Sequence, residues 1–252
     1  VFRDLDRHGH PLEPEVNGDQ LPHPDAASWV VAGVGSNGLK APGTGLHSGN
    51  SGTALIILLG LASRWSTPVM LDGDGSLRKR PFDVMIGALN AGGVNVSHGT
   101  GPEQLPLLIQ GPMSFDRPIQ LDATVSSQPV TSWLIASAGS STPARLTLSG
   151  TAVSQRHAEL TMDLCRSLGA SIERNGDGLV VQPWSPNFEH VEIDMPSDAS
   201  MMAFPLLAAL VCNTKVTLAN TPAFEDSLGH ELLVEYAASL GLTCEGGVWY
   251  PS

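Results

Sequence analysis

Residues 50–62 read NSGTALIILLGLA, in which small hydrogen-bonding residues lead directly into an apolar segment without charge. The same order returns in residues 126–138 (SSQPVTSWLIASA) and 197–209 (SDASMMAFPLLAA), whose starts follow at intervals of 76 and 71 residues. Each stretch predicts a buried helix with a polar N-terminus. Unpaired backbone N–H groups and a partial positive charge make such a terminus suitable for phosphate or carboxylate. The near-constant interval indicates an internal repeat.

A strand and a second helix complete the repeated unit. A short run with β-branched residues follows each apolar stretch, and a second helical segment then leads to a glycine that can take the left-handed conformation at a helix end. The strands are predicted at residues 67–72, 144–149 and 214–219, and the second helices end near Gly93, Gly169 and Gly241. The unit is therefore helix, strand, helix, strand, with further strands in the remaining sequence, and the fold class is α/β.

The two ends of the chain do not keep this period. Residues 1–9 (VFRDLDRHG) have the pattern of a second helix with its final glycine, but the helix that should come before them is missing. Residues 247–252 fall within the strand expected after Gly241. We expect the chain to be a piece of a longer protein, and proteolytic processing is the alternative that the sequence leaves open.

Composition favours a globular protein with a large core. The chain has 252 residues, of which 42% are hydrophobic and 15% charged, which suits one large domain or two smaller ones. Its longest apolar run, residues 54–62, is too short to cross a bilayer. Cys165, Cys212 and Cys244 lack metal-ligand spacing and are predicted to be buried, reduced thiols, which is typical of a cytoplasmic protein.

The charge of the chain argues against nucleic acid and anionic membranes as partners. The net charge is −12, which opposes nonspecific association with polyanions. Three of the 13 basic residues nevertheless lie together, as Arg78, Lys79 and Arg80, in the turn that follows the first predicted strand. This cluster is a candidate for local anion binding, and the alternative is a solvated turn.

Two other motifs do not hold up. Residues 33–38 (GVGSNG) satisfy the GxGxxG pattern, but Pro42 and further glycines occupy the place of the helix that a dinucleotide site requires. His8 and His10 form an HxH pair without a third ligand at a recognisable spacing, so we expect surface histidines and no metal site.

Four short motifs occur in order along the chain: NSGTA at 50–54, SLRKRP at 76–81, SSQ at 126–128 and SQRHAE at 154–159. Together they resemble the 5-enolpyruvylshikimate-3-phosphate (EPSP) synthase family of 3-phosphoshikimate 1-carboxyvinyltransferases. The SDAS segment at 197–200 resembles the start of that family's second domain. The resemblance extends over about residues 29–242.

This resemblance implies a fold of repeated βαβαββ units arranged in inverse α/β barrel-like domains, incomplete in this chain. Residues 1–195 would form the domain that binds shikimate 3-phosphate, without its first helix, and residues 196–252 the truncated start of the second domain. The implied reaction transfers the enolpyruvyl group of phosphoenolpyruvate to the 5-hydroxyl of shikimate 3-phosphate, on the route to chorismate and the aromatic amino acids. The resemblance further implies a monomer that needs no metal or organic cofactor.

The resemblance also implies which residues contact substrate. Hydroxyls and an amide at a helix start can donate hydrogen bonds to phosphate, a glycine lets the backbone approach an anion, and an arginine offers a planar fork. Serine N-capping alone is the alternative for the SSQ segment. The family pattern assigns shikimate 3-phosphate to Ser126, Ser127, Gln128, Ser154 and His157, and phosphoenolpyruvate to Gly52, Arg80 and Gln128, with Asn50 and Thr53 as support.

The chain departs from the family pattern at three places. His157 stands where tyrosine is frequent, Pro129 where an aromatic residue is frequent and Ile56 where arginine is frequent. Asp198 lies at a helix start, but repeat counting makes it an N-cap at the domain junction and not the catalytic aspartate. No catalytic residue is assigned, and the isolated chain is expected to turn over poorly or not at all.

Two further functions stay open at this point. The related enolpyruvyl transferase that acts on UDP-N-acetylglucosamine carries a reactive cysteine in the loop corresponding to residues 73–81, which has none here. A noncatalytic repeat protein that retains an anion pocket is the other alternative.

Overall fold

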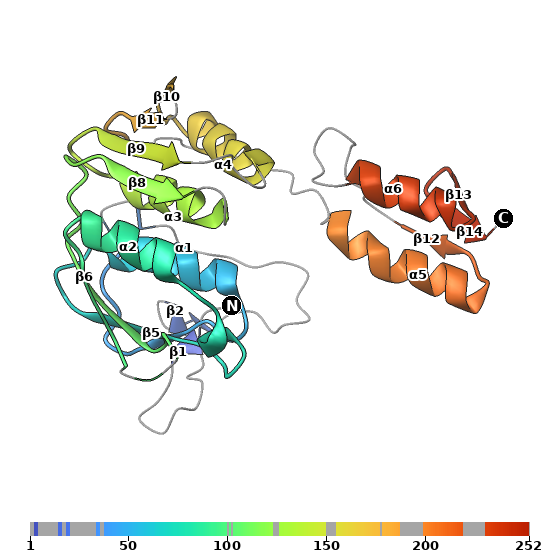
Figure 1. Cartoon of the computed structure of the whole chain (residues 1–252), viewed down its shortest axis with the longest axis horizontal. Coiled ribbons are helices and arrows are strands. Elements are labelled where there is room, and N and C mark those ends of the chain that lie inside the picture. Colours follow the sequence, from blue (N-terminus) through green and yellow to red (C-terminus); the bar gives the residue numbers. More distant parts are fainter. Residues whose placement is uncertain are drawn as a thin grey trace. The chain divides into compact units, whose positions relative to one another are not determined.

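The computed structural model describes the helices and strands of most of the chain. The described residues are 3–4, 15–16, 19–20, 34–35, 38–99, 101, 103–122, 126–149, 155–176, 178–186, 199–218 and 230–251. The chain divides into two compact units, Val1–Phe188 and Glu189–Ser252 (Figure 1). The predicted boundary at residues 195–196 lies outside the described residues.

The first repeat of the first unit alternates strands and helices around one mixed sheet. Its elements are β4 (Leu46–His47), α1 (Gly52–Ala62), β5 (Val69–Asp72), the 3₁₀ turn η1 (Leu77–Lys79), α2 (Asp83–Ala91), β6 (Asn95–His98) and β7 (Leu107–Gln110). The sheet order is β1-β4-β5-β7-β6, where β1 is Arg3–Asp4, and only β4 and β5 pair in parallel. A separate ladder joins β2 (Glu15–Val16) to β3 (Asp19–Gln20).

The second repeat reproduces this arrangement strand for strand. It contains β8 (Ile119–Asp122), α3 (Gln128–Ser137), β9 (Ala144–Ser149), α4 (Gln155–Ser167), β10 (Ile172–Asn175) and β11 (Gly178–Val181). The order β8-β9-β11-β10, with β8 and β9 parallel and the other pairs antiparallel, matches β4-β5-β7-β6 in the first repeat. The predicted βαβαββ unit is thus confirmed in two copies.

The second unit contains part of a third copy. Its elements are the 3₁₀ turn η2 (Ala199–Met202), α5 (Ala203–Cys212), β12 (Val216–Thr217), α6 (His230–Ser239), β13 (Leu242–Glu245) and β14 (Val248–Pro251). The antiparallel order β12-β14-β13 corresponds to β5-β7-β6. The helix predicted from residue 197 is a 3₁₀ turn before it becomes α-helical at Ala203, and residues 197 and 198 lie outside the described residues.

The glycines that were predicted to end the second helices do so. Gly93, Gly169 and Gly241 follow α2, α4 and α6 with φ of 83°, 102° and 88°. A side chain at these positions would strain the backbone, so the left-handed turn requires glycine. Each turn redirects the chain from a helix into the next strand.

The core of the first unit lies between its sheets and the helices α1, α2 and α3. Strands β5 and β8 alternate, with Val69, Leu71, Ile119 and Leu121 buried, as expected for strands with one covered face. Helix α1 packs against both α2 and α3 (Figure 1). An apolar helix without a polar face needs this cover on several sides.

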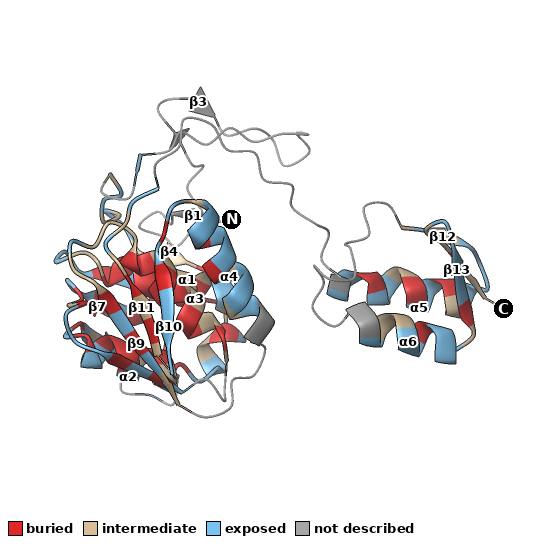
Figure 2. Cartoon of the chain, turned by 90° about the horizontal axis from the view of Figure 1, so that it is seen from above, coloured by how far each residue is buried: buried red, intermediate tan, exposed pale blue. Residues whose placement is uncertain are grey.

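Helix α5 differs from α1, although both are apolar all round. Figure 2 shows both buried and exposed segments along α5. Leu206 is buried, whereas Phe204, Leu207 and Val211 are 69%, 58% and 76% exposed. The prediction of a fully buried helix is therefore wrong for residues 203–209. Among the described residues of this unit, the main contacts of α5 are with η2, β12 and β14.

The cysteines are also less buried than predicted. All three are free, but only Cys165 is buried, whereas Cys212 and Cys244 are exposed. Cys212 ends α5 and Cys244 lies in β13, both of which have an uncovered face in this unit. Within the described part of the chain, no helix has the length and apolar character that a bilayer span requires, and no group of His, Cys, Asp and Glu has the arrangement of a metal site.

Candidate functional site

The start of α1 is shaped by a turn that precedes it. Gly49 has φ of 57° and donates its backbone N–H to His47 Nδ1 at 3.0 Å. Ser51 is the N-cap, and its Oγ accepts a hydrogen bond from the N–H of Ala54 at 3.2 Å. Gly52 and Thr53 form the first turn, where backbone N–H groups point out of the helix end.

Arg80 lies directly against this helix start. Its Nη2 donates to Asn50 Oδ1 at 2.7 Å. A β-carbon added at Gly52 would lie 3.2 Å from Arg80 Nη1, closer than most contacts of this kind. Gly52 therefore makes room for the guanidinium, and the predicted association of Asn50, Gly52 and Arg80 has a direct geometric basis.

The basic cluster at residues 78–80 is not uniform. Arg78 forms a two-point ion pair with Asp72, in which Nε donates to Oδ1 at 3.0 Å. The hydrogen bond and charge of Asp72 raise the pKa of Arg78 above its ordinary value. Lys79 and Arg80 are exposed. Arg78 is thus committed to a structural contact, whereas Arg80 faces the start of α1.

The start of α3 meets the start of α1 through Gln128. Gln128 Nε2 donates to Thr53 Oγ1 at 2.8 Å, and the N–H of Gln128 donates to Ser126 Oγ at 3.1 Å. Ser127 is buried at the N-cap position of α3, without a side-chain capping bond. Pro129 occupies the first turn of α3, where its missing N–H costs no helical hydrogen bond.

One turn further along, the two helices come into backbone contact. Ser132 Oγ donates to the carbonyl oxygen of Ile56 at 2.6 Å. A β-carbon at Gly60 would lie 2.7 Å from the carbonyl oxygen of Ser132 and 2.3 Å from its hydroxyl. Because only glycine permits this approach, the spacing between α1 and α3 is fixed close to the site.

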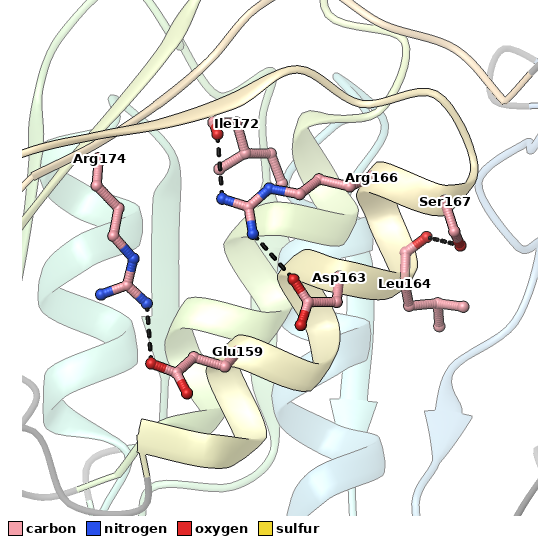
Figure 3. A network of polar contacts seen from close by, with 7 residues as sticks. All are labelled: Glu159, Asp163, Leu164, Arg166, Ser167, Ile172 and Arg174. Atoms are coloured by element: carbon pink, nitrogen blue, oxygen red, sulfur yellow. Dashed lines mark hydrogen bonds and ion pairs between the residues drawn. The ribbon is translucent and has the colours of Figure 1, made fainter. Parts of the chain in front are cut away.

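Side-chain contacts join helix α4 to α3 and to β10. Thr131 Oγ1 and Thr161 Oγ1 lie 2.9 Å apart and join α3 to α4. Arg174 donates to Glu159 at 3.1 Å, and Arg166 bridges the Asp163 carboxylate and the carbonyl of Ile172 (Figure 3). These contacts fix the direction of α4.

His157 of α4, one of the predicted substrate residues, is not joined to this cluster. His157 is exposed near the start of α4 and its backbone carbonyl accepts from Thr161 at 3.0 Å. Among the contacts of the described residues, none connects its imidazole to Gln128 or Arg80. Ser154 lies outside the described residues. The structure thus brings together Asn50, Gly52, Thr53, Arg80 and Gln128, with Ser126 and Ser127 beside them.

The sequence reasoning missed the acidic residues that hold this site. Asp74 Oδ1 accepts from the N–H groups of Ser76 and Leu77 at 2.9 and 2.8 Å, and Asp72 holds Arg78. The signal was present, because an aspartate two or three residues before a short turn commonly accepts its N–H groups.

A comparison with protein families bears on this geometry. A family model described as EPSP synthase (3-phosphoshikimate 1-carboxyvinyltransferase) matches residues 23–244, which is most of the chain. The chain belongs to the EPSP synthase family. The matched residues include the starts of α1 and α3 and the turn that carries Arg80.

Curated relatives of this EPSP synthase family member include several with the same description. The 3-phosphoshikimate 1-carboxyvinyltransferase of Magnetococcus marinus is 35% identical over 183 residues, covering 73% of this chain and 40% of the relative. That of Methanocella arvoryzae is 29% identical and covers 80% and 47%. The pentafunctional AROM polypeptide of Eremothecium gossypii is 29% identical over 87% of this chain and 13% of its own length. The chain thus spans less than half the length of these relatives.

Solved structures agree with the fold of the family. Two structures of EPSP synthase from Acinetobacter baumannii each give a TM-score of 0.65 at 23% sequence identity. Each match covers 92% of this chain and 52% of the solved chain. At this identity the likeness concerns the fold, and it agrees with the repeated α/β units of this EPSP synthase family member.

Proposed function

We propose that this chain recognises the substrates of an enolpyruvyl transfer from phosphoenolpyruvate to the 5-hydroxyl of shikimate 3-phosphate. The observation that carries the proposal is the joining of two helix starts by Thr53 and Gln128, with Arg80 beside them. Both substrates are anions, and helix N-termini with a fixed guanidinium are suited to bind them. The family match supports this reaction over transfer to UDP-N-acetylglucosamine.

The phosphoenolpyruvate side of the site consists of Gly52 and Arg80, supported by Asn50. Arg80 donates one N–H to Asn50 and keeps others of its five donors for a carboxylate or phosphate. The backbone at Gly52 carries no side chain that would block an approaching anion. The bond to Asn50 orients the guanidinium of Arg80 at the start of α1.

The shikimate 3-phosphate side consists of Ser126, Ser127 and Gln128, with Ser154 and His157 as further contacts. Serine hydroxyls donate to phosphate oxygens, and the N-terminal end of α3 adds a partial positive charge. Gln128 donates one amide hydrogen to Thr53, and its second amide hydrogen and its Oε1 remain available to substrate. It therefore lies at the junction of the two substrates and serves both.

The chemistry of the whole protein places specific demands on this site. The 5-hydroxyl of shikimate 3-phosphate adds to the enol carbon of phosphoenolpyruvate while the methylene carbon gains a proton, and phosphate then leaves as a proton is lost. Holding two anions in contact distance costs entropy and charge repulsion, which fixed donors offset. Arg80 and the helix starts supply positioning and positive potential, and no residue of this chain is assigned to the proton transfers.

The proposal also includes the domain organisation and the oligomeric state of the protein. Residues 1–195 correspond to the shikimate-phosphate-binding domain and residues 196–252 to the start of the second domain. The protein acts as a cytoplasmic monomer on small-molecule substrates. Sedimentation at several concentrations tests the monomer, because a dimer would sediment faster as concentration rises.

Calorimetry on the chain tests the substrate assignment. Shikimate 3-phosphate is titrated first, phosphoenolpyruvate is then titrated into the complex, and UDP-N-acetylglucosamine serves as the competing candidate. Binding of shikimate 3-phosphate supports the proposal. Binding of UDP-N-acetylglucosamine alone would support the related transferase, and a folded chain that binds neither ligand would favour a noncatalytic repeat protein.

A further inference from the structure

The carboxylate at the end of β5 has a partner that substrate recognition does not use. Asp72 Oδ1 accepts from Arg78 Nε at 3.0 Å and from the N–H of Gly73 at 2.8 Å, and its second oxygen accepts from Arg78 Nη2. The side chains of Asp72 and Arg78 are 18% and 38% exposed. A two-point pair of this kind fixes the plane of the guanidinium as well as its distance.

The loop between these two residues is anchored at several further points. Asp74 caps the η1 turn through the N–H groups of Ser76 and Leu77, and its own N–H donates to the carbonyl of Gly49 at 2.8 Å. Leu77 is fully buried. A β-carbon at Gly73 would lie 2.5 Å from the Leu77 side chain, so η1 packs directly on the backbone there.

A continuous path therefore leads from Asp72 to the start of α1. The N–H of Arg78 donates to the carbonyl of Asp74, and the N–H of Arg80 donates to the carbonyl of Leu77, both at 3.0 Å. Arg80 then reaches Asn50. The side chain of Arg78 is the part of η1 that returns to β5, two residues before Arg80.

We propose that Asp72 is a positioning residue, which holds Arg80 at the start of α1 by fixing Arg78. The expected effect of Asp72 on phosphoenolpyruvate binding rests on the proposed function, whereas its expected effect on the Arg80–Asn50 contact does not. Asp72 also prevents Arg78 from offering a second free guanidinium beside the anion site. The loop thus presents one oriented arginine in place of two mobile ones.

A purely electrostatic role for the pair makes the opposite prediction for one variant. Asp72→Asn removes a negative charge close to the site and would strengthen anion binding if only the local field mattered. Arg78→Gln removes a positive charge and would weaken it. If the pair positions Arg80, both substitutions weaken binding, although they change the local charge in opposite directions.

The test combines a ligand-free and a ligand-dependent measurement on the full chain. Nuclear magnetic resonance follows the side-chain amide of Asn50 in the unmodified chain and in Asp72→Asn, Arg78→Gln, the double variant and Arg80→Gln. Calorimetry measures phosphoenolpyruvate binding to the same proteins in the presence of shikimate 3-phosphate. Asp163→Asn, which breaks the Asp163–Arg166 pair on α4, is the matched control.

We expect Asp72→Asn and Arg78→Gln each to move the Asn50 amide resonance in the direction that Arg80→Gln moves it. Each should weaken phosphoenolpyruvate binding about fivefold, and the double variant should be no weaker than the single ones, because residues in one ion pair are not independent. Asp163→Asn should change neither measurement. An Asn50 resonance that Asp72→Asn leaves in place, or tighter binding by Asp72→Asn, would overturn the proposal.

The two proposals fail in distinguishable ways. If the unmodified chain binds no phosphoenolpyruvate, the proposed function is contradicted, and the Asn50 resonance alone decides whether Asp72 positions Arg80. If the unmodified chain binds and Asp72→Asn binds equally well, the substrate assignment stands and the positioning role is wrong.

Discussion

Gln128 donates its side-chain amide to the hydroxyl of Thr53, and this single bond joins residues that are 75 positions apart in the sequence. Thr53 belongs to the first turn of α1 and Gln128 to the first turn of α3. The two proposed substrate sides are thereby connected through one amide group. A change on either side of this bond should affect the other.

Removing the Thr53 hydroxyl should weaken shikimate 3-phosphate binding. Thr53→Val keeps the shape of the side chain but leaves the Gln128 amide without its partner, so we expect a loss of about 0.5–1.5 kcal/mol in binding free energy. Calorimetry measures the loss. Thr131→Val, the same change one turn along α3 at a contact with α4, is the control, and equal affinity of Thr53→Val and the unmodified chain would contradict the prediction.

Removing the Arg80 guanidinium should weaken phosphoenolpyruvate binding. Arg80→Ala deletes the oriented donors beside Gly52, and the scale of charge-assisted hydrogen bonds gives an expected loss of about 1–3 kcal/mol. Lys79→Ala removes the same charge from an exposed neighbour and should have a smaller effect. If the two variants lose affinity equally, net charge and not the position of Arg80 determines binding.

A β-carbon at Gly60 should destabilise the first unit. Gly60→Ala places a methyl group against the backbone of Ser132, so the helices must separate, at an expected cost of about 1–3 kcal/mol in the free energy of unfolding. Gly87→Ala is the matched control, because a β-carbon at this exposed position of α2 meets nothing within 4 Å. It should stabilise by up to about 1 kcal/mol. Urea unfolding measures the free energy of unfolding of both variants. Equal stabilities would contradict the close approach of α1 to α3 at Gly60.

The three cysteines should differ in reactivity. Burial raises the pKa of the Cys165 thiol above its ordinary value of 9.0, which lowers the thiolate fraction that reacts with iodoacetamide. Cys212 and Cys244 are exposed. Mass spectrometry of the native protein should find the exposed thiols alkylated first and Cys165 modified only after denaturant is added. Early modification of Cys165 would show that its environment opens readily.

The same raised pKa gives the stability a pH dependence of defined sign. The pKa of Cys165 is higher in the folded protein than in the unfolded chain. Its contribution to stability is therefore complete at pH values below the unfolded pKa and is lost as the pH rises through the folded pKa. The free energy of unfolding should therefore fall above about pH 9. Cys165→Ala removes this contribution, so its stability should decline less steeply over the same range; an identical decline would assign the effect to other groups.

The repeated architecture could be predicted from the sequence because its signals are local. Apolar runs, β-branched runs and terminating glycines each act over a few residues, and the predicted strand at 144–149 agrees with β9 at both ends. The start of α1 differs from the predicted start by two residues, because Ser51 is the cap and Asn50 precedes it.

The parts that could not be predicted depend on contacts between distant segments. The sequence places Arg78 in a candidate anion-binding cluster, whereas Asp72 holds it, and only the path of the loop brings these two residues together. The exposure of α5 depends on which elements cover it, which its apolar sequence does not encode. The contact between Gln128 and Thr53 likewise requires two helices to meet at one end.

The close packing of α1 against α3 has a consequence for the origin of the site. Each helix is an equivalent part of one duplicated unit, and each alone presents a single polar tip. Because α1 and α3 lie side by side, their starts meet at the seam between the copies and combine polar groups that neither copy has by itself. The two starts differ in their residues, with Thr53 on one side and Gln128 on the other, so each half of one repeated framework presents a different set of hydrogen-bonding groups.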